Sequence, residues 1–110
     1  MVDSGAFVIV LVTVANEEEA ERLAYTLVEE RLAACANLLG PIRSIFRWQG
    51  AVEEASEHLL LLKARRDAVE ELSARVRALH SYDVPEVLAL PIVAGSEPYL
   101  EWLGESTARR

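Results

Sequence analysis

The sequence predicts one α+β domain in which two helices cover one face of an antiparallel four-stranded sheet. Apolar, β-branched runs alternate with segments whose apolar residues recur at helical spacing. The order of these segments is strand, helix, strand, strand, helix, strand, which is the split βαβ plan. A glycine turn at Gln49-Gly50 joins the two middle strands into a long hairpin. A chain of 110 residues has the length of one domain with one core, so we expect a single domain over residues 1–110.

The first strand and the first helix are predicted from consecutive segments. Phe7–Val14 is apolar without alternation, as in a central strand that is covered on both faces, or on one face and at an interface. Asn16 stands three residues before Glu19, which is the spacing of a capping box, and a helix is expected to begin there. The apolar stripe of this helix packs on the sheet and consists of Ala20, Leu23, Ala24, Leu27 and Val28.

The two middle strands are expected to form a hairpin that projects beyond the body. The second strand lies within the segment from Leu32 to Trp48, where Gly40-Pro41 predicts a kink or bulge. The third strand is expected at Ala51–Arg65. Its first half carries Glu53, Glu54, Glu57 and His58, whereas Leu59–Leu62 is apolar on both faces. The hairpin tip should therefore contact water, and its base should be buried.

The second half of the chain supplies a helix and an edge strand. Asp67 precedes Glu70 by three residues, again a capping-box spacing, and the helix is expected to end near His80. Its apolar stripe consists of Val69, Leu72, Val76 and Leu79. The fourth strand is expected at Val87–Leu90, between prolines that suit a strand with one free edge.

A short last helix completes the ferredoxin-like core. Ser96 is expected to cap this helix over Glu97–Glu105, and Arg109 and Arg110 are expected to fray. Both main helices then lie on one face of the sheet, which leaves the other face uncovered. Association of identical subunits is expected to cover that face. The reason is that the apolar residues of the hairpin cannot all point toward the helices, and these are Ile42, Ile45, Phe46, Trp48, Leu59 and Leu61.

Charge and motifs exclude several functions that this fold plan can host. A net charge of −7 repels phosphate backbones, and the first strand offers only Phe7 as an aromatic, so a nucleic-acid partner is not expected. A copper(I) chaperone would need Cys-x-x-Cys after the first strand, where this chain reads Thr13-Val14-Ala15-Asn16. No nucleophile, base and orienting group stand together, so an enzyme is not predicted. The apolar runs are too short to cross a membrane.

Each candidate ligand residue also has a structural interpretation. Cys35 has apolar neighbours, as an inert buried thiol would have, and it is the single cysteine, which is typical of a reducing compartment such as the cytoplasm. His80 follows the second helix, where it can stabilise the helix C-terminus or bind a ligand. His58 has two interpretations, an exposed residue without a function or a ligand that joins carboxylates. Lys63 also has two, a cation that faces a carboxylate or an anion and a side chain that extends to solvent, and Trp48 suits interface packing.

Four segments resemble the CutA family, and the match runs from about Val8 to Trp102. They are Val12-Thr13 with Asn16–Ala20, Glu30–Asn37, Ser44–Gly50 and His80–Glu86. The resemblance implies a cytoplasmic homotrimer of ferredoxin-like subunits, similar in architecture to the PII signalling trimers, with clefts between subunits near the loop after the second helix. It also implies a role in tolerance to copper and other divalent cations.

The resemblance also implies which residues lie at these clefts. Carried over by position, they are Cys35, Trp48, Lys63, His80 and Tyr82. His80 and Cys35 are the metal donors among them, and the carboxylates of Glu57 and Glu86 can assist. Ser81 and Ala15 stand where prolines are common in the family, and Val12 stands where some members carry a cysteine proposed as a ligand.

Two functional hypotheses follow. The first is a trimeric binding protein that holds a divalent metal ion, such as Cu²⁺, through His80 with Cys35 or a carboxylate. The second is a PII-like signalling or scaffold trimer that binds a small anionic metabolite through Lys63 and nearby arginines.

Overall fold

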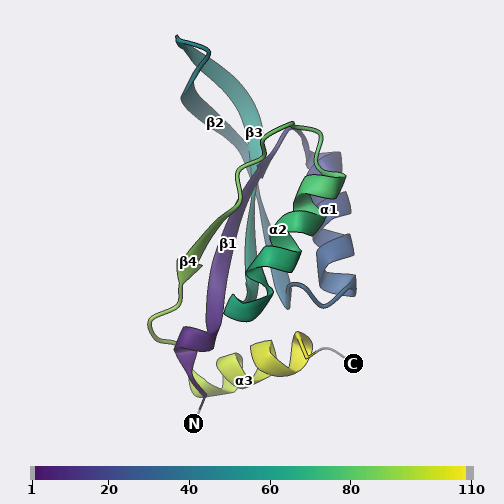
Figure 1. Ribbon diagram of the computed structural model, residues 1–110, viewed down its shortest axis with the longest axis vertical. Helices are drawn as coiled ribbons and strands as arrows, with labels where there is room; N and C mark the ends of the chain where they lie inside the picture. Colours follow the sequence, from purple (N-terminus) through teal and green to yellow (C-terminus); the bar gives the residue numbers. More distant parts are fainter. Residues whose placement is uncertain (1, 109–110) are drawn as a thin grey trace.

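A computed structural model describes residues 2–108 and contains a four-stranded sheet with two helices packed on one face (Figure 1). The strand order is β2-β3-β1-β4, and all neighbouring strands are antiparallel. The ferredoxin-like α+β prediction is confirmed, while the expected fraying of Arg109 and Arg110 lies outside the described residues. The elements are β1 (Phe7–Val14), α1 (Glu17–Glu29), β2 (Cys35–Trp48), β3 (Ala51–Arg65), α2 (Val69–Leu79), β4 (Leu88–Pro91) and α3 (Glu97–Ser106), with 3₁₀ turns at Ser4–Ala6 and Arg66–Ala68.

Helix α1 begins as the sequence predicts, with one difference in its cap. The Asn16 side chain accepts a 2.9 Å hydrogen bond from the Glu19 amide. Glu19 reaches back one residue further than a capping box requires and accepts from the Ala15 amide at 3.3 Å. Its carboxylate can do so because it also binds the loop after α2, which fixes its position.

Three local expectations differ from the structure. Asp67 does not cap α2, because it lies inside the 3₁₀ turn and the helix begins at Val69 without a side-chain cap. Ser96 precedes α3, but its side chain accepts no hydrogen bond from the helix. Strand β4 lies one residue later than expected and includes Pro91, which pairs with Val8 at the sheet edge.

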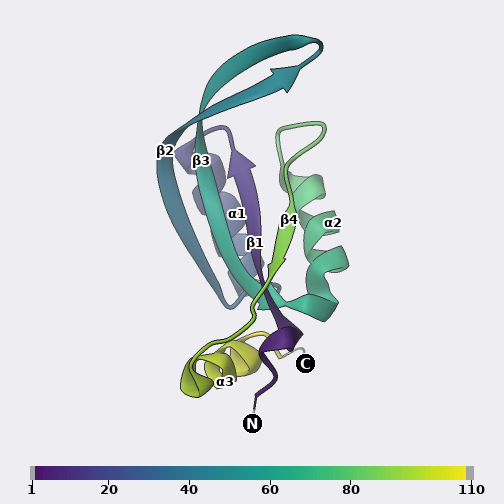
Figure 2. The ribbon, with the colours of Figure 1, turned by 90° about the vertical axis from the view of Figure 1, so that its left-hand side faces the viewer.

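A bulge in β2 separates the sheet from the projecting hairpin. The pair Leu39 and Leu59 is followed by the pair Ile42 and Glu57, so β2 carries one extra residue at the predicted Gly40-Pro41 break. Beyond the bulge the two strands curve away from the body (Figure 2). The hairpin accounts for the longest dimension of the molecule, 48 Å against 26 Å and 22 Å. Gln49 and Gly50 close it with positive φ angles of 49° and 81°.

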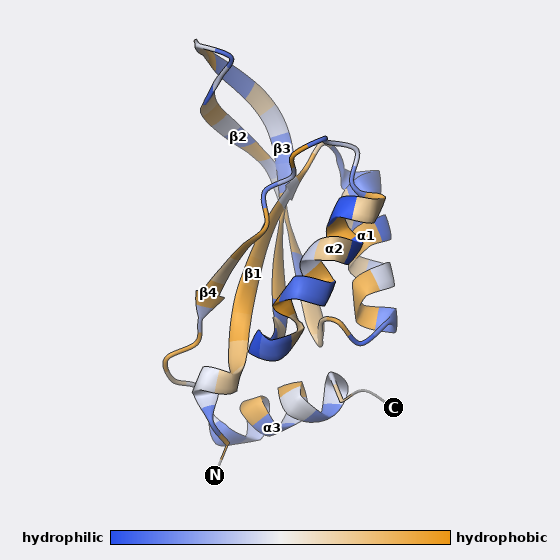
Figure 3. Cartoon of the chain, in the orientation of Figure 1, coloured by the Kyte–Doolittle hydropathy of each residue, from blue (hydrophilic) through white to orange (hydrophobic). Residues whose placement is uncertain are grey.

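The core lies between the sheet and the two main helices. Strand β1, apolar along its length in Figure 3, directs Val8, Val10, Val12 and Val14 into this core. The opposite face, which we call the open face, has no helix over most of its area. A smaller cluster beneath α3, built on Phe7, Leu100 and Leu103, covers one end of it. The apolar residues that remain on the open face include Ile9, Leu11, Leu39, Leu59, Leu61, Leu88 and Leu90.

Candidate functional site

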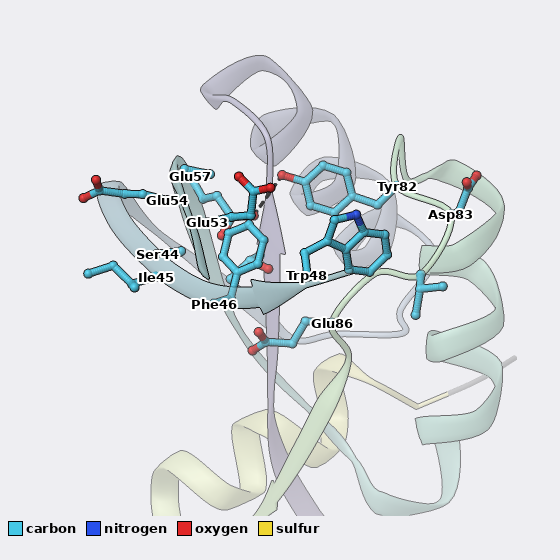
Figure 4. A pocket seen from close by; sticks show the side chains of 13 residues that line it. Ser44, Ile45, Phe46, Trp48, Glu53, Glu54, Glu57, Tyr82, Asp83 and Glu86 are labelled. Atoms are coloured by element: carbon cyan, nitrogen blue, oxygen red, sulfur yellow. Dashed lines mark hydrogen bonds between the residues drawn. The ribbon is translucent and has the colours of Figure 1, made fainter. Parts of the chain in front are cut away.

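A pocket of about 740 Å³ lies where the hairpin curves over the loop that joins α2 to β4 (Figure 4). We call it the hairpin pocket. Strands β2 and β3 supply one wall, and the α2–β4 loop supplies the other. Its lining residues are Thr13, Ser44, Ile45, Phe46, Trp48, Glu53, Glu54, Ala55, Glu57, Tyr82, Asp83, Val84 and Glu86.

Four of the residues expected at a cleft lie together in this pocket. Trp48 and Glu57 come from the hairpin, and Tyr82 and Glu86 come from the α2–β4 loop. These segments are distant in the sequence, and the curvature of the hairpin brings them together (Figure 4). The other cleft candidates, Cys35, Lys63 and His80, are not among the lining residues.

A hydrogen bond between Tyr82 and Glu57 joins the two walls of the pocket. The Tyr82 hydroxyl donates to Oε2 of Glu57 at 2.8 Å. Glu57 is 7% exposed although it is a charged residue. Burial, followed by the hydrogen bond and the negative charge of Glu57, raises the pKa of Tyr82 to about 12. The tyrosine therefore remains a donor at any physiological pH.

His80 lies behind Tyr82, with its side chain fully buried. Nε2 lies 2.7 Å from the Thr13 carbonyl oxygen, which can only accept, so Nε2 carries the proton. Nδ1 then accepts from the Tyr82 amide at 3.0 Å. The imidazole is neutral in this arrangement, both ring nitrogens are in hydrogen bonds, and the ring centroid lies 4.7 Å from that of Tyr82.

Glu19 anchors the loop that carries His80 and Tyr82. Its carboxylate accepts from the Ser81 amide at 2.8 Å and the Ser81 hydroxyl at 2.9 Å, besides the Ala15 amide. Both amides are available because neither position holds a proline. Burial raises the pKa of Glu19, but these hydrogen bonds outweigh it and lower the pKa below its usual value.

The structure places Cys35 and Lys63 together at another part of the open face. Lys63 Nζ lies 3.9 Å from the Cys35 sulfur and also donates to the Asn37 side chain. Burial raises the pKa of Tyr99, and its contact with Cys35 adds to the shift. Lys63 pairs with Ile9, whereas the hairpin pocket reaches Thr13, which is four residues or about 13 Å further along β1.

His80 and Cys35 are thus not brought together within one chain. Among residues 2–108 there is no group of three histidine, cysteine, aspartate or glutamate residues arranged to hold a metal ion. His58, whose ring packs against Gly40, leaves Nδ1 buried without a hydrogen bond. A metal ion bound by residues of the described part of one chain would therefore need further ligands from water or from a second subunit.

Sequence reasoning did not find the residues that position the pocket. Glu19 was assigned to helix capping, and Thr13 and Ser81 had no expected role, yet these three residues hold the loop of His80 and Tyr82 in place. Glu53 and Phe46 also line the pocket. One signal was present, because Glu19 directly precedes the apolar stripe of α1 and therefore lies at the edge of the buried face.

Comparison of the sequence with known proteins identifies the family of the chain. The family model described as CutA1 divalent ion tolerance protein matches residues 8–106. The chain belongs to the CutA1 divalent ion tolerance family. The divalent-cation tolerance protein CutA of Thermus thermophilus is 54% identical over 99 residues, which are 90% of this chain and 96% of that protein. The chloroplastic CutA of Arabidopsis thaliana is 50% identical over 100 residues, 91% of this chain.

Solved CutA structures match the fold along nearly the whole chain. The structure of the Thermus thermophilus protein has a TM-score of 0.91 at 52% identity and covers 93% of this chain and 99% of its own. The Oryza sativa CutA1 structure has a TM-score of 0.92 at 43% identity, and the match covers 98% of this chain and 100% of the Oryza sativa chain. The chain spans about half the length of the chloroplastic relatives, 55% for Arabidopsis thaliana.

The match places the chain in a family whose name refers to divalent-cation tolerance. CutA1 proteins are named for this tolerance and not for a reaction. In the part of the chain that the structure describes, no helix is long and apolar enough to span a membrane.

Proposed function

We propose that the chain forms a homotrimer and contributes to divalent-cation tolerance by binding divalent cations, Cu²⁺ among them, in clefts between its subunits. The observation that carries this proposal is the position of the hairpin pocket. The pocket shares Thr13 with the open face, so subunits that associate through this face would add their own side chains to it.

The exposed apolar surface supports self-association. Leu88 and Leu90 are 55% and 47% exposed in the single chain, next to the half-buried Ile9 and Leu11. Leu39, which pairs with Leu59 on the same face, is 41% exposed. Burying this area between copies removes it from water, which is the main favourable term in protein association.

The charge of the pocket supports a cation as its ligand. Five carboxylates line the pocket. Within residues 2–108, Glu54 is the carboxylate of this group that forms an ion pair, and its partner is Arg43. Carboxylates are suitable ligands for hard divalent cations, and a second subunit can complete a coordination shell that one chain leaves open. The same charges disfavour an anionic metabolite in this pocket, where it would face Glu53, Glu57 and Glu86. The PII-like alternative depends instead on Lys63, which lies outside the pocket.

His80 and Cys35 could bind the metal ion only if their present contacts changed. His80 would have to release the Tyr82 amide or the Thr13 carbonyl before a ring nitrogen could bind a metal ion. Cys35 would have to bind beside the Lys63 ammonium, as part of a second subunit's contribution. We infer a cytoplasmic location from the single free thiol, as a reducing compartment favours it.

Calorimetric titration with Cu²⁺ at neutral pH tests the proposal. Sedimentation velocity should show a trimer, and Glu57→Gln should weaken Cu²⁺ binding at least tenfold, because a buried carboxylate oxygen with a negative charge is lost. Glu101→Gln, on the exposed side of α3, is the matched control and should bind as the wild type does. An unchanged titration in His80→Ala or Cys35→Ala removes that residue from the site, and no binding in the wild type refutes the proposal.

A further inference from the structure

We propose that the hairpin pocket also binds a small organic cation of the aliphatic diamine or polyamine class. The inference does not rest on metal binding, because it uses groups that a single chain already brings together. These groups are the rings of Phe46, Trp48 and Tyr82 and the carboxylates of Glu53 and Glu57 (Figure 4).

The size and the walls of the pocket suit an organic ligand. A volume of about 740 Å³ is in the range of small-molecule sites and far exceeds the space that a bare metal ion fills. Aromatic rings give no ligands to a metal ion, but their faces attract ammonium groups and pack against methylene chains. Ile45 and Val84 add aliphatic surface to the same lining.

Glu57 provides the anionic centre of the site. It lines the pocket and is more than nine-tenths buried, yet among the described residues a hydrogen bond reaches Oε2 and none reaches Oε1. His58 Nδ1 is the buried polar side-chain atom that lacks a hydrogen bond in this part of the chain, so Oε1 of Glu57, which also has none, is open to the pocket and can accept from a ligand. An ammonium group can donate to Oε1 while it contacts a ring face.

Further carboxylates can hold the second charge of a diamine. Glu53 lines the pocket from strand β3, and Glu86 lines it from the α2–β4 loop (Figure 4). Within residues 2–108, neither Glu53 nor Glu86 forms an ion pair with a basic side chain. An extended dication can therefore place one ammonium at each group and its methylenes on the rings between them.

Spermidine titration of the full-length, assembled protein at fixed ionic strength tests the inference. We expect saturable binding in the wild type and an affinity about tenfold lower in Trp48→Leu, because the ring that faces the cation is lost. Trp48→Phe keeps a ring and should retain most of the affinity. Trp102→Leu, a half-exposed tryptophan of α3 outside the pocket, is the matched control and should bind as the wild type does.

The variants separate this inference from the metal proposal. Trp48→Leu should lower spermidine affinity and leave Cu²⁺ affinity within twofold, whereas Glu57→Gln should lower both. The inference is overturned if the wild type gives no saturable binding, as would happen if a neighbouring subunit's own side chain filled the pocket. It is equally overturned if Trp48→Leu and Trp102→Leu bind alike, since binding would then reflect the net charge alone.

Discussion

The Tyr82 hydroxyl and the Glu57 carboxylate meet at 2.8 Å and connect the α2–β4 loop to the base of the hairpin. The tyrosine is held from behind, because its amide donates to His80 and its ring contacts that imidazole. One hydrogen bond thus couples the position of a loop to a buried charge on strand β3. Loop order and pocket charge should consequently change together.

Removing the Tyr82 hydroxyl should have a pH-dependent effect. Tyr82→Phe should lower the free energy of unfolding by about 1–2 kcal/mol at neutral pH, because Glu57 loses its donor. A raised pKa means that the protonated phenol stabilises the fold below pH 10 and that this contribution is lost as the pH rises toward about 12. Urea unfolding should therefore show the two proteins converging over this interval. Tyr25→Phe, at an exposed position, should leave the wild-type pH profile intact.

Glu19 should be the most sensitive carboxylate of the α1 helix. Glu19→Ala leaves the amides of Ala15 and Ser81 without their acceptor and should cost about 2–4 kcal/mol in urea unfolding. The exposed neighbour Glu18→Ala should change stability by about 0.5 kcal/mol or less. Because folding lowers the pKa of Glu19, its charged carboxylate stabilises the fold at pH values above the usual pKa of 4.5. This stabilisation is lost as the pH falls through the folded-state pKa. A wild type and variant that respond equally to acid would contradict this assignment.

The order of elements could be predicted from the sequence because local patterns determine it. Asn16 and the apolar stripe of α1 specify a helix start and face without reference to the rest of the chain. The Gly40-Pro41 break likewise predicted the bulge, because those two residues interrupt any strand. Asp67 and Ser96 failed as caps since a cap depends on the backbone geometry of the preceding turn, which sequence spacing does not determine.

A part of the pocket lining could be predicted from the sequence, but none of its contacts. Trp48 and Tyr82 were named through the family resemblance and Glu57 and Glu86 as assisting carboxylates, and these four residues lie in one pocket. The separation of Cys35 from His80 depends on strand register, which pairs Lys63 with Cys35 at one end of the sheet. Register follows from long-range pairing and is not visible in local sequence.

The close approach of Gly40 to His58 gives a test of the bulge. A Cβ atom at Gly40 would lie 2.7 Å from Cγ and 2.9 Å from Nε2 of the His58 ring, closer than atoms can pack. Gly40→Ala should therefore destabilise the protein by about 1–3 kcal/mol in urea unfolding. Adding His58→Ala removes the ring and should restore part of that loss. Gly50→Ala meets no neighbour within 4 Å and has a φ of 81°, so its smaller cost should be independent of His58.

The exposed leucines of the open face lead to a prediction about the association of subunits. Leu88 and Leu90 pair with Leu11 and Ile9 and stand about half exposed on a four-stranded sheet whose other face is the core. A charge at these positions contacts water in a lone subunit, but it would have to be desolvated without a partner at an interface. Leu88→Glu should therefore leave the subunit folded and prevent its association.

Sedimentation velocity at micromolar concentration measures this directly. The wild type should sediment as a trimer and Leu88→Glu as a monomer whose circular dichroism retains the helix and strand signals. Val93→Glu is the matched control, because Val93 is 87% exposed in the segment after β4 and adds the same charge outside the paired strands. A wild-type monomer, or a trimer that tolerates Leu88→Glu, would mean that the open face is not the contact between subunits. The hairpin pocket would then have to bind its ligands with the residues of one chain alone.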